Sequence, residues 1–387
     1  MSCFVTKLID PVLLTQESVR CQSVTPNDDG ALDVMARPLS DMGFQIHRLR
    51  FEDKDTPAID NVFARLGTGG RHFCYMGHTD VVPVGSVDDW TYPPFAAEIH
   101  NGKMYGRGVA DMKGGNCAFV AAVSRFLSEY PDFNESISLL LTGDEESVAV
   151  NGSIKVIEWM KDKNQLPDVA LVGEPGNPTQ MGQVMRVGRR GSLNGRIQVR
   201  GIQGHSAYPE RADNPVVHIT NLVHRLVHEK LDDGTDDFPP SHIVISSVDV
   251  GNPAPNIIPA RAEALFNMRF NDAWSAQTLE RHIRQILDDI YPKYDLTVWS
   301  NAESFVTANH PFRDIVSKAI EKVSGQKPEA NTGGGTSDAR FIAKYCPVVE
   351  YGLVNATIHK VDEHADVRDI EVLTETYTEI LRSYFIQ

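Results

Sequence analysis

Histidine and acidic residues occur at several points in the chain directly after short apolar segments. Side chains of these types bind divalent metal ions, and a carboxylate beside a histidine can orient the ring by accepting its second N–H. His78 and Asp80 have the two-residue spacing that places both side chains on one side of an extended chain. In TGDEES, one of the adjacent Glu145 and Glu146 can bind a metal ion while the other faces a water molecule. The full set is His78, Asp80, Asp111, Glu145, Glu146, Glu174, His359 and His364.

Each of these motifs also has an ordinary structural interpretation. An H-x-D pair can be a hydrogen-bonded surface pair, Asp111 before two glycines can be a helix N-cap, and Glu145 and Glu146 can belong to a solvated loop. Their common position after apolar segments is the stronger signal, because α/β sheets bind ligands beyond the carboxyl ends of their strands. Three carboxylates and two histidines from this set, without any thiolate, would suffice to bind two metal ions that share one bridging carboxylate. Ligands of these types suit zinc, cobalt or manganese.

The segments that must position these residues alternate between strand and helix patterns. Near-continuous apolar runs at 71–77, 136–143 and 168–173 predict buried strands, and 116–127 and 153–161 predict helices between them. This alternation predicts an α/β sheet with helices on both faces. The pattern resumes near the end of the chain, with a strand at 348–352 and helices at 312–323, 338–344 and 369–385.

The middle of the chain has a different pattern, which predicts an inserted α+β domain. Its order of strand, helix, strand, strand, helix and strand is that of a ferredoxin-like fold. We therefore expect residues 1–187 and 302–387 to form one domain and 188–301 to form the insert. The six segments are 192–201, 215–231, 244–250, 262–270, 279–290 and 296–300.

Composition excludes several classes of protein. The 387 residues are enough for two domains, and the net charge of −15 disfavours a nucleic-acid partner. No apolar run is long enough to span a membrane, and the start of the chain, MSCFVTKLIDP, lacks a signal-peptide pattern, so we expect a cytoplasmic protein. The five cysteines, Cys3, Cys21, Cys74, Cys117 and Cys346, include no C-x-x-C pair and predict reduced thiols.

Three of the motifs resemble signature segments of a known family. GHTDVVPVG, YGRGVADMKGG and TGDEES are similar to segments of the co-catalytic zinc peptidases and deacylases, which include aminoacylases, acetylornithine deacetylase and glutamate carboxypeptidase. The resemblance extends over essentially the whole chain, and it implies two zinc ions per subunit, with cobalt or manganese as alternatives. It implies His78 and Glu174 for one ion, Glu146 and His359 for the other, Asp111 as the bridge, Glu145 as general base and acid, and Asp80 as the group that orients His78.

Other segments resemble the members of this family that hydrolyse N-succinyl-LL-2,6-diaminopimelate to succinate and LL-2,6-diaminopimelate, for lysine and peptidoglycan precursors. These segments are MRVGRRGSLNG, QGHSAYPERADNP, GGTSDARF and VNATIHKVDE. The resemblance implies amide hydrolysis by a metal-activated water. It also implies that the insert is a lid that forms a homodimer, and that His205 crosses the dimer to stabilise the oxyanion in the neighbouring site.

The anionic substrate requires local cations in an acidic protein. Arg189, Arg190 and Arg269 are candidates, because a guanidinium pairs with a carboxylate through two hydrogen bonds. The resemblance favours Arg189 and Arg269, with Thr336 and Asn355 as hydrogen-bonding groups and Asn256 from the partner subunit. Alternatives remain open: another N-acyl-amino-acid deacylase or carboxypeptidase of the family, a binding protein without activity, or a structural zinc protein.

Overall fold

The computed structural model describes residues 8–386, which divide into two compact units. The first comprises the chain up to Val187 together with Thr307–Asn331 and the chain from Ser337 onward. The second comprises Gly188–Val306 and Thr332–Thr336. The chain returns to the first unit at 307, later than the expected 302, because β16 (Phe305–Val306) pairs with β9 (Gly188–Arg189) inside the second unit.

A mixed eight-stranded sheet forms the centre of the first unit. Its order is β1-β2-β6-β3-β7-β18-β8-β17, and β6, β3, β7 and β18 are mutually parallel where they pair. These four strands are entirely buried, as their near-continuous apolar sequences predict. The strand bounds are β1 Gln45–Asp53, β2 Thr56–Leu66, β3 His72–His78, β6 Ser136–Thr142, β7 Val169–Val172, β8 Val184–Arg186, β17 Glu329–Asn331 and β18 Val348–Glu350.

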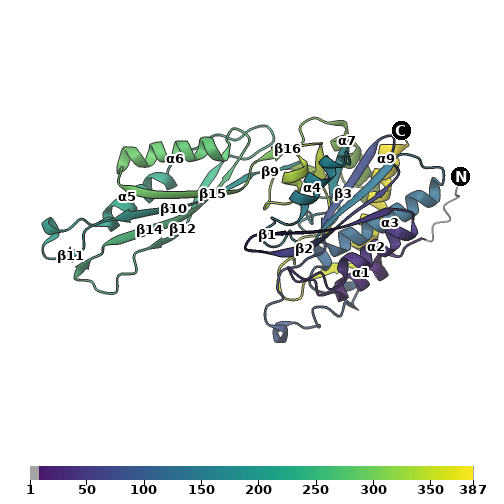
Figure 1. The fold of residues 1–387 in the computed structure, drawn as a ribbon, viewed down its shortest axis with the longest axis horizontal. Helices are drawn as coiled ribbons and strands as arrows, with labels where there is room; N and C mark the ends of the chain where they lie inside the picture. The colour runs from purple at the N-terminus through teal and green to yellow at the C-terminus, as the bar shows by residue number, and fades with distance from the viewer. Residues whose placement is uncertain (1–7, 387) are drawn as a thin grey trace. The chain divides into compact units, whose positions relative to one another are not determined.

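Helices cover both faces of this sheet. On one face Phe73 and Tyr75 of β3 contact the rings of α3 and α9, with Phe119 stacked 4.2 Å from Tyr75. Phe63 of β2 points to the opposite face, where its ring centroid lies 5.5 Å from that of Trp159 on α4. Figure 1 shows α1, α2, α3 and α9 together beside the sheet. The helix bounds are α1 Pro11–Arg20, α2 Ala31–Asp41, α3 Gly114–Glu129, α4 Ser153–Asp162, α7 Pro311–Ser324, α8 Ala339–Ile342 and α9 Val367–Phe385.

The second unit is an antiparallel sheet of order β12-β14-β10-β15 with two helices on one face. Alternate residues of the strands, such as Ile197 and Phe266, pack against Leu222 of α5 and Ile283 of α6. This order and connectivity confirm the predicted ferredoxin-like fold. The bounds are β10 Gly191–Arg200, α5 Pro215–Val227, β12 His242–Asp249, β14 Arg261–Phe270, α6 Ala276–Ile290 and β15 Tyr294–Ala302.

The remaining strands are short. β11 (Gly204–His205) pairs with β13 (Ile257–Ile258), and β4 (Glu98–His100), β5 (Lys103–Tyr105) and β19 (His364–Asp366) form a three-stranded sheet. The α/β prediction is confirmed, although the helix expected at 338–344 is only the single turn α8 and the β1–β2 hairpin has no counterpart in the prediction.

The described residues bear on two further expectations, which concern membrane-spanning segments and the state of the cysteines. No helix among them combines the length and the apolar character needed to cross a bilayer. Cys21, Cys74, Cys117 and Cys346 are free thiols, while Cys3 and most of the N-terminal segment MSCFVTKLIDP lie outside the described residues.

Candidate metal centre

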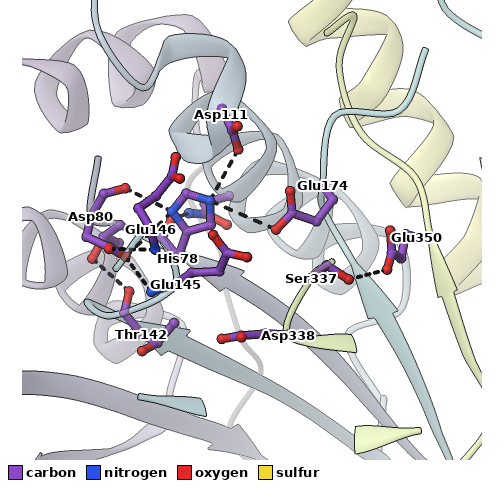
Figure 2. Close-up of polar contacts among 12 residues, drawn as sticks. His78, Asp80, Asp111, Thr142, Glu145, Glu146, Glu174, Ser337, Asp338 and Glu350 are labelled. Carbon is purple, nitrogen blue, oxygen red and sulfur yellow. Dashed lines mark hydrogen bonds and ion pairs between the residues drawn. The ribbon is translucent and has the colours of Figure 1, made fainter. Parts of the chain in front are cut away.

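The acidic and histidine residues predicted from the sequence converge at one edge of the eight-stranded sheet. Four parallel strands end there, and each one either ends in or is followed by one of these side chains. Figure 2 labels His78, Glu145, Glu146 and Glu174 among them. The residues and strands are His78 at the end of β3, Glu145 and Glu146 after β6, Glu174 after β7 and His359 after β18. This convergence follows from parallel pairing, which places all carboxyl ends at the same edge.

Asp111 lies between the two histidines and presents one carboxylate oxygen to each. Its Oδ1 is 3.2 Å from Nε2 of His78, and its Oδ2 is 3.3 Å from Nε2 of His359. Beyond His78 lies Glu174, with 4.0 Å between Nε2 and Oε1, and beyond His359 lies Glu146 at 2.9 Å. Asp111 thus lies between a His78–Glu174 pair and a His359–Glu146 pair.

An irregular turn, rather than the helix itself, carries Asp111. The backbone of Asp111 is extended (φ −123°, ψ 95°) within the turn Val109–Lys113, and α3 begins only at Gly114. The N-cap interpretation of Asp111 is therefore wrong. Gly108 enters the turn with φ 82°, a left-handed conformation that glycine adopts without steric strain. A Cβ on Gly115 would lie 2.9 Å from the carbonyl oxygen of Gly173, so the glycine allows α3 to begin close to β7.

Asp80 supports His78 in a different way from the one expected. The Nδ1 of His78 lies 2.8 Å from the main-chain carbonyl of Asp80, whereas the Asp80 carboxylate lies 3.6 Å away. That carboxylate instead accepts hydrogen bonds from the backbone N–H groups of Glu145 and Glu146 and from the hydroxyl of Thr25. Asp80 thus fixes both the His78 ring and the loop that follows β6.

Glu145 occupies a place suited to proton transfer. Its carboxylate lies with His78 and Glu174 in a group whose nearest ligand atoms are all within 4.8 Å of one another. Burial, followed by repulsion from Glu174, raises the pKa of Glu145 well above the usual glutamate range. A carboxyl group with a raised pKa holds a proton more strongly than an ordinary glutamate does.

The cluster concentrates negative charge around the two histidines. Burial opposes protonation of His78, yet Asp111, Asp80, Glu145 and Glu174 together raise its pKa well above the usual value. Hydrogen bonds to Asp111 and Glu146 raise the pKa of His359 to about 10. A second group of mutually close ligand atoms is His78, Asp111 and Glu146. Imidazole and carboxylate donors around concentrated negative charge fit divalent metal ions such as zinc, cobalt or manganese.

His364, which was grouped with His359 from the sequence, lies elsewhere. It belongs to β19, and its Nε2 is 3.1 Å from Nζ of Lys103. The expectation that both histidines of ATIHKVDEH reach the cluster is therefore wrong for His364. Two residues that the sequence analysis did not single out, Arg107 and Glu363, form a buried ion pair beside Asp111. Their position within the motifs GRGVADMKGG and ATIHKVDEH is the sequence signal that could have identified them.

Most of the predicted substrate-binding residues belong to the second unit. Arg189 is buried and donates hydrogen bonds to the carbonyls of Gly333 and Gly335, next to Thr336. His205 and Asn256 are neighbours, because the N–H of Ser206 donates to the carbonyl of Asn256 and His205 pairs with Ile257. Asn355 lies in the first unit, on the chain between β18 and His359.

A cationic group lies on the open face of the second unit's sheet. Arg269 of β14 is directly opposite His242 of β12, and both point away from the apolar core. Burial and then the neighbouring Arg269 lower the pKa of Arg190, while burial and then Arg190 lower the pKa of His242. The two arginines therefore concentrate positive charge on this face beside His242.

Comparison with known proteins agrees with the fold. The model of peptidase family M20/M25/M40 matches residues 74–383. A curated relative from Rhodospirillum centenum, succinyl-diaminopimelate desuccinylase, is 49% identical over 376 residues, which cover 97% of each chain. An M20 family metallo-carboxypeptidase from Sulfolobus solfataricus has a TM-score of 0.77 at 18% identity, with 98% of this chain and 100% of that chain covered.

A further solved structure adds a dinuclear example. The YXEP protein of Bacillus subtilis, described as a dinuclear metal-binding peptidase of the M20 family, has a TM-score of 0.69 at 15% identity, with 96% of each chain covered. At this identity the likeness concerns the fold. The family match, the near-complete coverage of the curated relative and the shared fold lead to one conclusion: the chain belongs to peptidase family M20/M25/M40.

Proposed function

We propose that the protein hydrolyses the amide bond of N-succinyl-LL-2,6-diaminopimelate to succinate and LL-2,6-diaminopimelate. The observation that carries this proposal is the 48–49% identity to curated succinyl-diaminopimelate desuccinylases over nearly their whole length. The metallo-carboxypeptidase, by contrast, shares the fold at 18% identity. The proposed product serves the synthesis of lysine and of peptidoglycan precursors.

The proposed centre holds two zinc ions, with cobalt or manganese as possible replacements. His78 and Glu174 would hold one ion, Glu146 and His359 the other, and Asp111 both, which is supported by the placement of its two oxygens between the histidines. When bound, the ions supply Lewis acidity that acidifies water and polarises the amide carbonyl.

The protein's own groups divide the remaining work. Glu145 accepts the proton of the attacking water and delivers it to the leaving amine, a role supported by its place beside His78 and Glu174. Asp80 keeps His78 and the Glu145–Glu146 loop in place through the hydrogen bonds to its main-chain carbonyl and carboxylate. Loss of the hydrogen bond to His78 would misplace a candidate metal ligand, and loss of the hydrogen bonds to the loop would misplace Glu145 and Glu146.

The second unit supplies substrate recognition in this proposal. Arg189 and Arg269 bind substrate carboxylates and Thr336 donates a hydrogen bond, while Asn355 of the first unit donates another. The protein acts as a cytoplasmic homodimer in which His205 and Asn256 reach the partner's site, and His205 stabilises the developing oxyanion. The exposure of His205 and its closeness to Asn256 support a shared role at such a site.

Turnover and metal content, measured on the same purified sample, test the proposal. We expect rapid release of succinate from N-succinyl-LL-2,6-diaminopimelate, loss of activity after chelation, and recovery on addition of Zn²⁺. N-acetylornithine and C-terminal peptide substrates serve as comparisons. If either comparison substrate were hydrolysed faster, that substrate would be assigned to the protein instead of N-succinyl-LL-2,6-diaminopimelate. Activity that survives complete metal removal would refute the metal-dependent mechanism.

A further inference from the structure

Glu363 is a fully buried carboxylate that contacts the turn carrying Asp111. Its Oε1 accepts hydrogen bonds from the backbone N–H groups of Ala110 (3.0 Å) and Asp111 (3.3 Å). Its Oε2 accepts from the N–H of Gly108 (3.0 Å) and from Nη1 of Arg107 (2.9 Å). Both oxygens are therefore engaged by donors that belong to one short segment, residues 107–111.

Arg107 extends this contact to the loop that carries His359. Besides Glu363, its guanidinium donates to the carbonyl of Lys360 (3.1 Å), the residue directly after His359, and to that of Pro83 (3.3 Å). It also lies over the ring of Trp90, 5.2 Å from the centroid. Only 3% of Arg107 is exposed, so these bonds form away from competing water.

The segment held in this way has little conformational support of its own. Asp111 and Met112 have non-helical dihedral angles, and His359 has φ 60°, in the left-handed region that a residue with a Cβ rarely adopts. Neither ligand is fixed by a regular helix or strand, so external hydrogen bonds must hold each one in place. The Arg107–Glu363 pair supplies such bonds to both segments.

We propose that Glu363 and Arg107 are positioning residues that set Asp111 and His359 at the spacing required to bind two metal ions. The inference rests on the metal centre proposed above, although not on the identity of the substrate. The pair contacts the backbone next to Asp111 and His359 rather than their side chains. Substitution of either member should therefore weaken metal binding although every candidate ligand atom is still present.

Zn²⁺ affinity of the metal-free protein tests this role. In E363Q, the amide nitrogen would face N–H donors that now meet a carboxylate oxygen, so we expect Zn²⁺ binding to weaken by about 10–100-fold, as for other groups that orient ligands. R107K, which replaces the planar fork by a single ammonium group, should weaken binding in the same direction by a smaller factor. Competition with a chelating dye provides the measurement.

The matched control is E379Q. Glu379 is also a largely buried glutamate paired with an arginine, but its partners, Lys322 and Arg382, belong to α7 and α9. Its substitution should leave Zn²⁺ affinity within about twofold of the unmodified protein, because it touches no ligand segment. The absorption spectrum of the Co²⁺-loaded protein gives a second readout, which should change in E363Q and stay constant in E379Q.

The outcomes separate the inference from the proposed function. Unchanged Zn²⁺ affinity and an unchanged Co²⁺ spectrum in E363Q would overturn the positioning role, even if the protein is a desuccinylase. Equal weakening in E363Q and E379Q would also overturn it, because the effect would then be one of general stability. If circular dichroism shows that E363Q does not fold, the Zn²⁺ affinity and Co²⁺ spectrum of R107K are compared with those of E379Q instead. Failure of the unmodified protein to bind Zn²⁺ would instead refute the proposed centre.

Discussion

The two units place chemical groups by different structural means. In the first unit, parallel strands end at a common edge, and residues far apart in sequence, from His78 to His359, converge on a small cluster. In the second, an antiparallel sheet packs one face against α5 and α6 and leaves the other for side chains such as Arg269 and His242. The first arrangement suits metal binding and proton transfer, and the second suits recognition of a charged substrate.

This comparison predicts different kinetic effects in the two units. Substitutions at the edge of the first sheet should reduce kcat or metal binding, whereas substitutions on the open face of the second sheet should raise KM. The four variants that follow are arranged from the largest expected effect to the smallest.

Glu145→Gln should have the largest effect. The amide cannot accept the proton of water, so we expect kcat to fall by about 10²–10⁴-fold with little change in KM. Metal content measured by elemental analysis should remain equal to that of the unmodified protein, because the ligands inferred from the resemblance do not include Glu145. A near-normal rate would show that another group acts as the base.

His205→Ala should reduce kcat by about 10²–10³-fold if His205 stabilises the oxyanion. Mixing this variant with Glu145→Gln tests the proposed crossing between subunits. A mixed dimer would contain one site with its own Glu145 and the partner's unmodified histidine, so about a quarter of the original activity should return. No recovery after subunit exchange would indicate that His205 acts within its own subunit or not at all.

Arg269→Met should act mainly on KM, which we expect to rise by about 10–100-fold, the usual cost of losing a charge-assisted hydrogen bond to a carboxylate. Methionine preserves much of the apolar stem of arginine while removing the charge. Arg261→Met, an exposed residue on the same strand, is the matched control. An equal loss in both variants, or a fall in kcat alone, would contradict the assignment of recognition to this face.

His72→Gln should change stability rather than catalysis. Burial, and next the nearby Arg65, lower the pKa of His72 to about 4, while the unfolded chain protonates near 6.5. Unfolding therefore takes up a proton between these values, and the free energy of unfolding falls as the pH falls from 6.5 toward 4. Between pH 7 and pH 5 this contribution is about 2 kcal/mol.

Urea denaturation of the metal-free protein measures this effect. The His72→Gln variant should lose about 2 kcal/mol of the pH dependence between pH 7 and pH 5, whereas His224→Gln, at an exposed position of α5, should retain it. Identical pH profiles for all three proteins would show that His72 is not held neutral by burial.

The sequence predicts the first unit's site well because a single physical rule places it. Four apolar segments, each followed by an acidic or histidine residue, require only parallel pairing to bring those residues together. The same rule does not predict local backbone geometry: Asp111 has the sequence of an N-cap, yet it lies in an irregular turn before Gly114. It also fails for His364, because the chain after His359 turns away to pair with β5.

The sequence pattern also does not predict which carboxylates are buried. Glu363 stands in the polar segment HKVDEH, yet its side chain is fully buried against the backbone of residues 108–111. Periodicity reports which residues face a core, but not which carboxylates are enclosed by backbone N–H groups from a distant segment. Asp80 shows the same limit, because its hydrogen bonds to the loop after β6 depend on tertiary structure.

The distribution of the candidate ligands along the chain has a consequence for how the protein is made. His78, Asp111, Glu146 and Glu174 precede the second unit, whereas His359 follows it. Because domains generally fold as units, the first unit cannot complete its sheet and its site until β18, His359 and α9 have left the ribosome, near the end of translation. A chain that stops before His359 therefore lacks one of the candidate ligands, so assembly of the proposed centre depends on nearly complete synthesis.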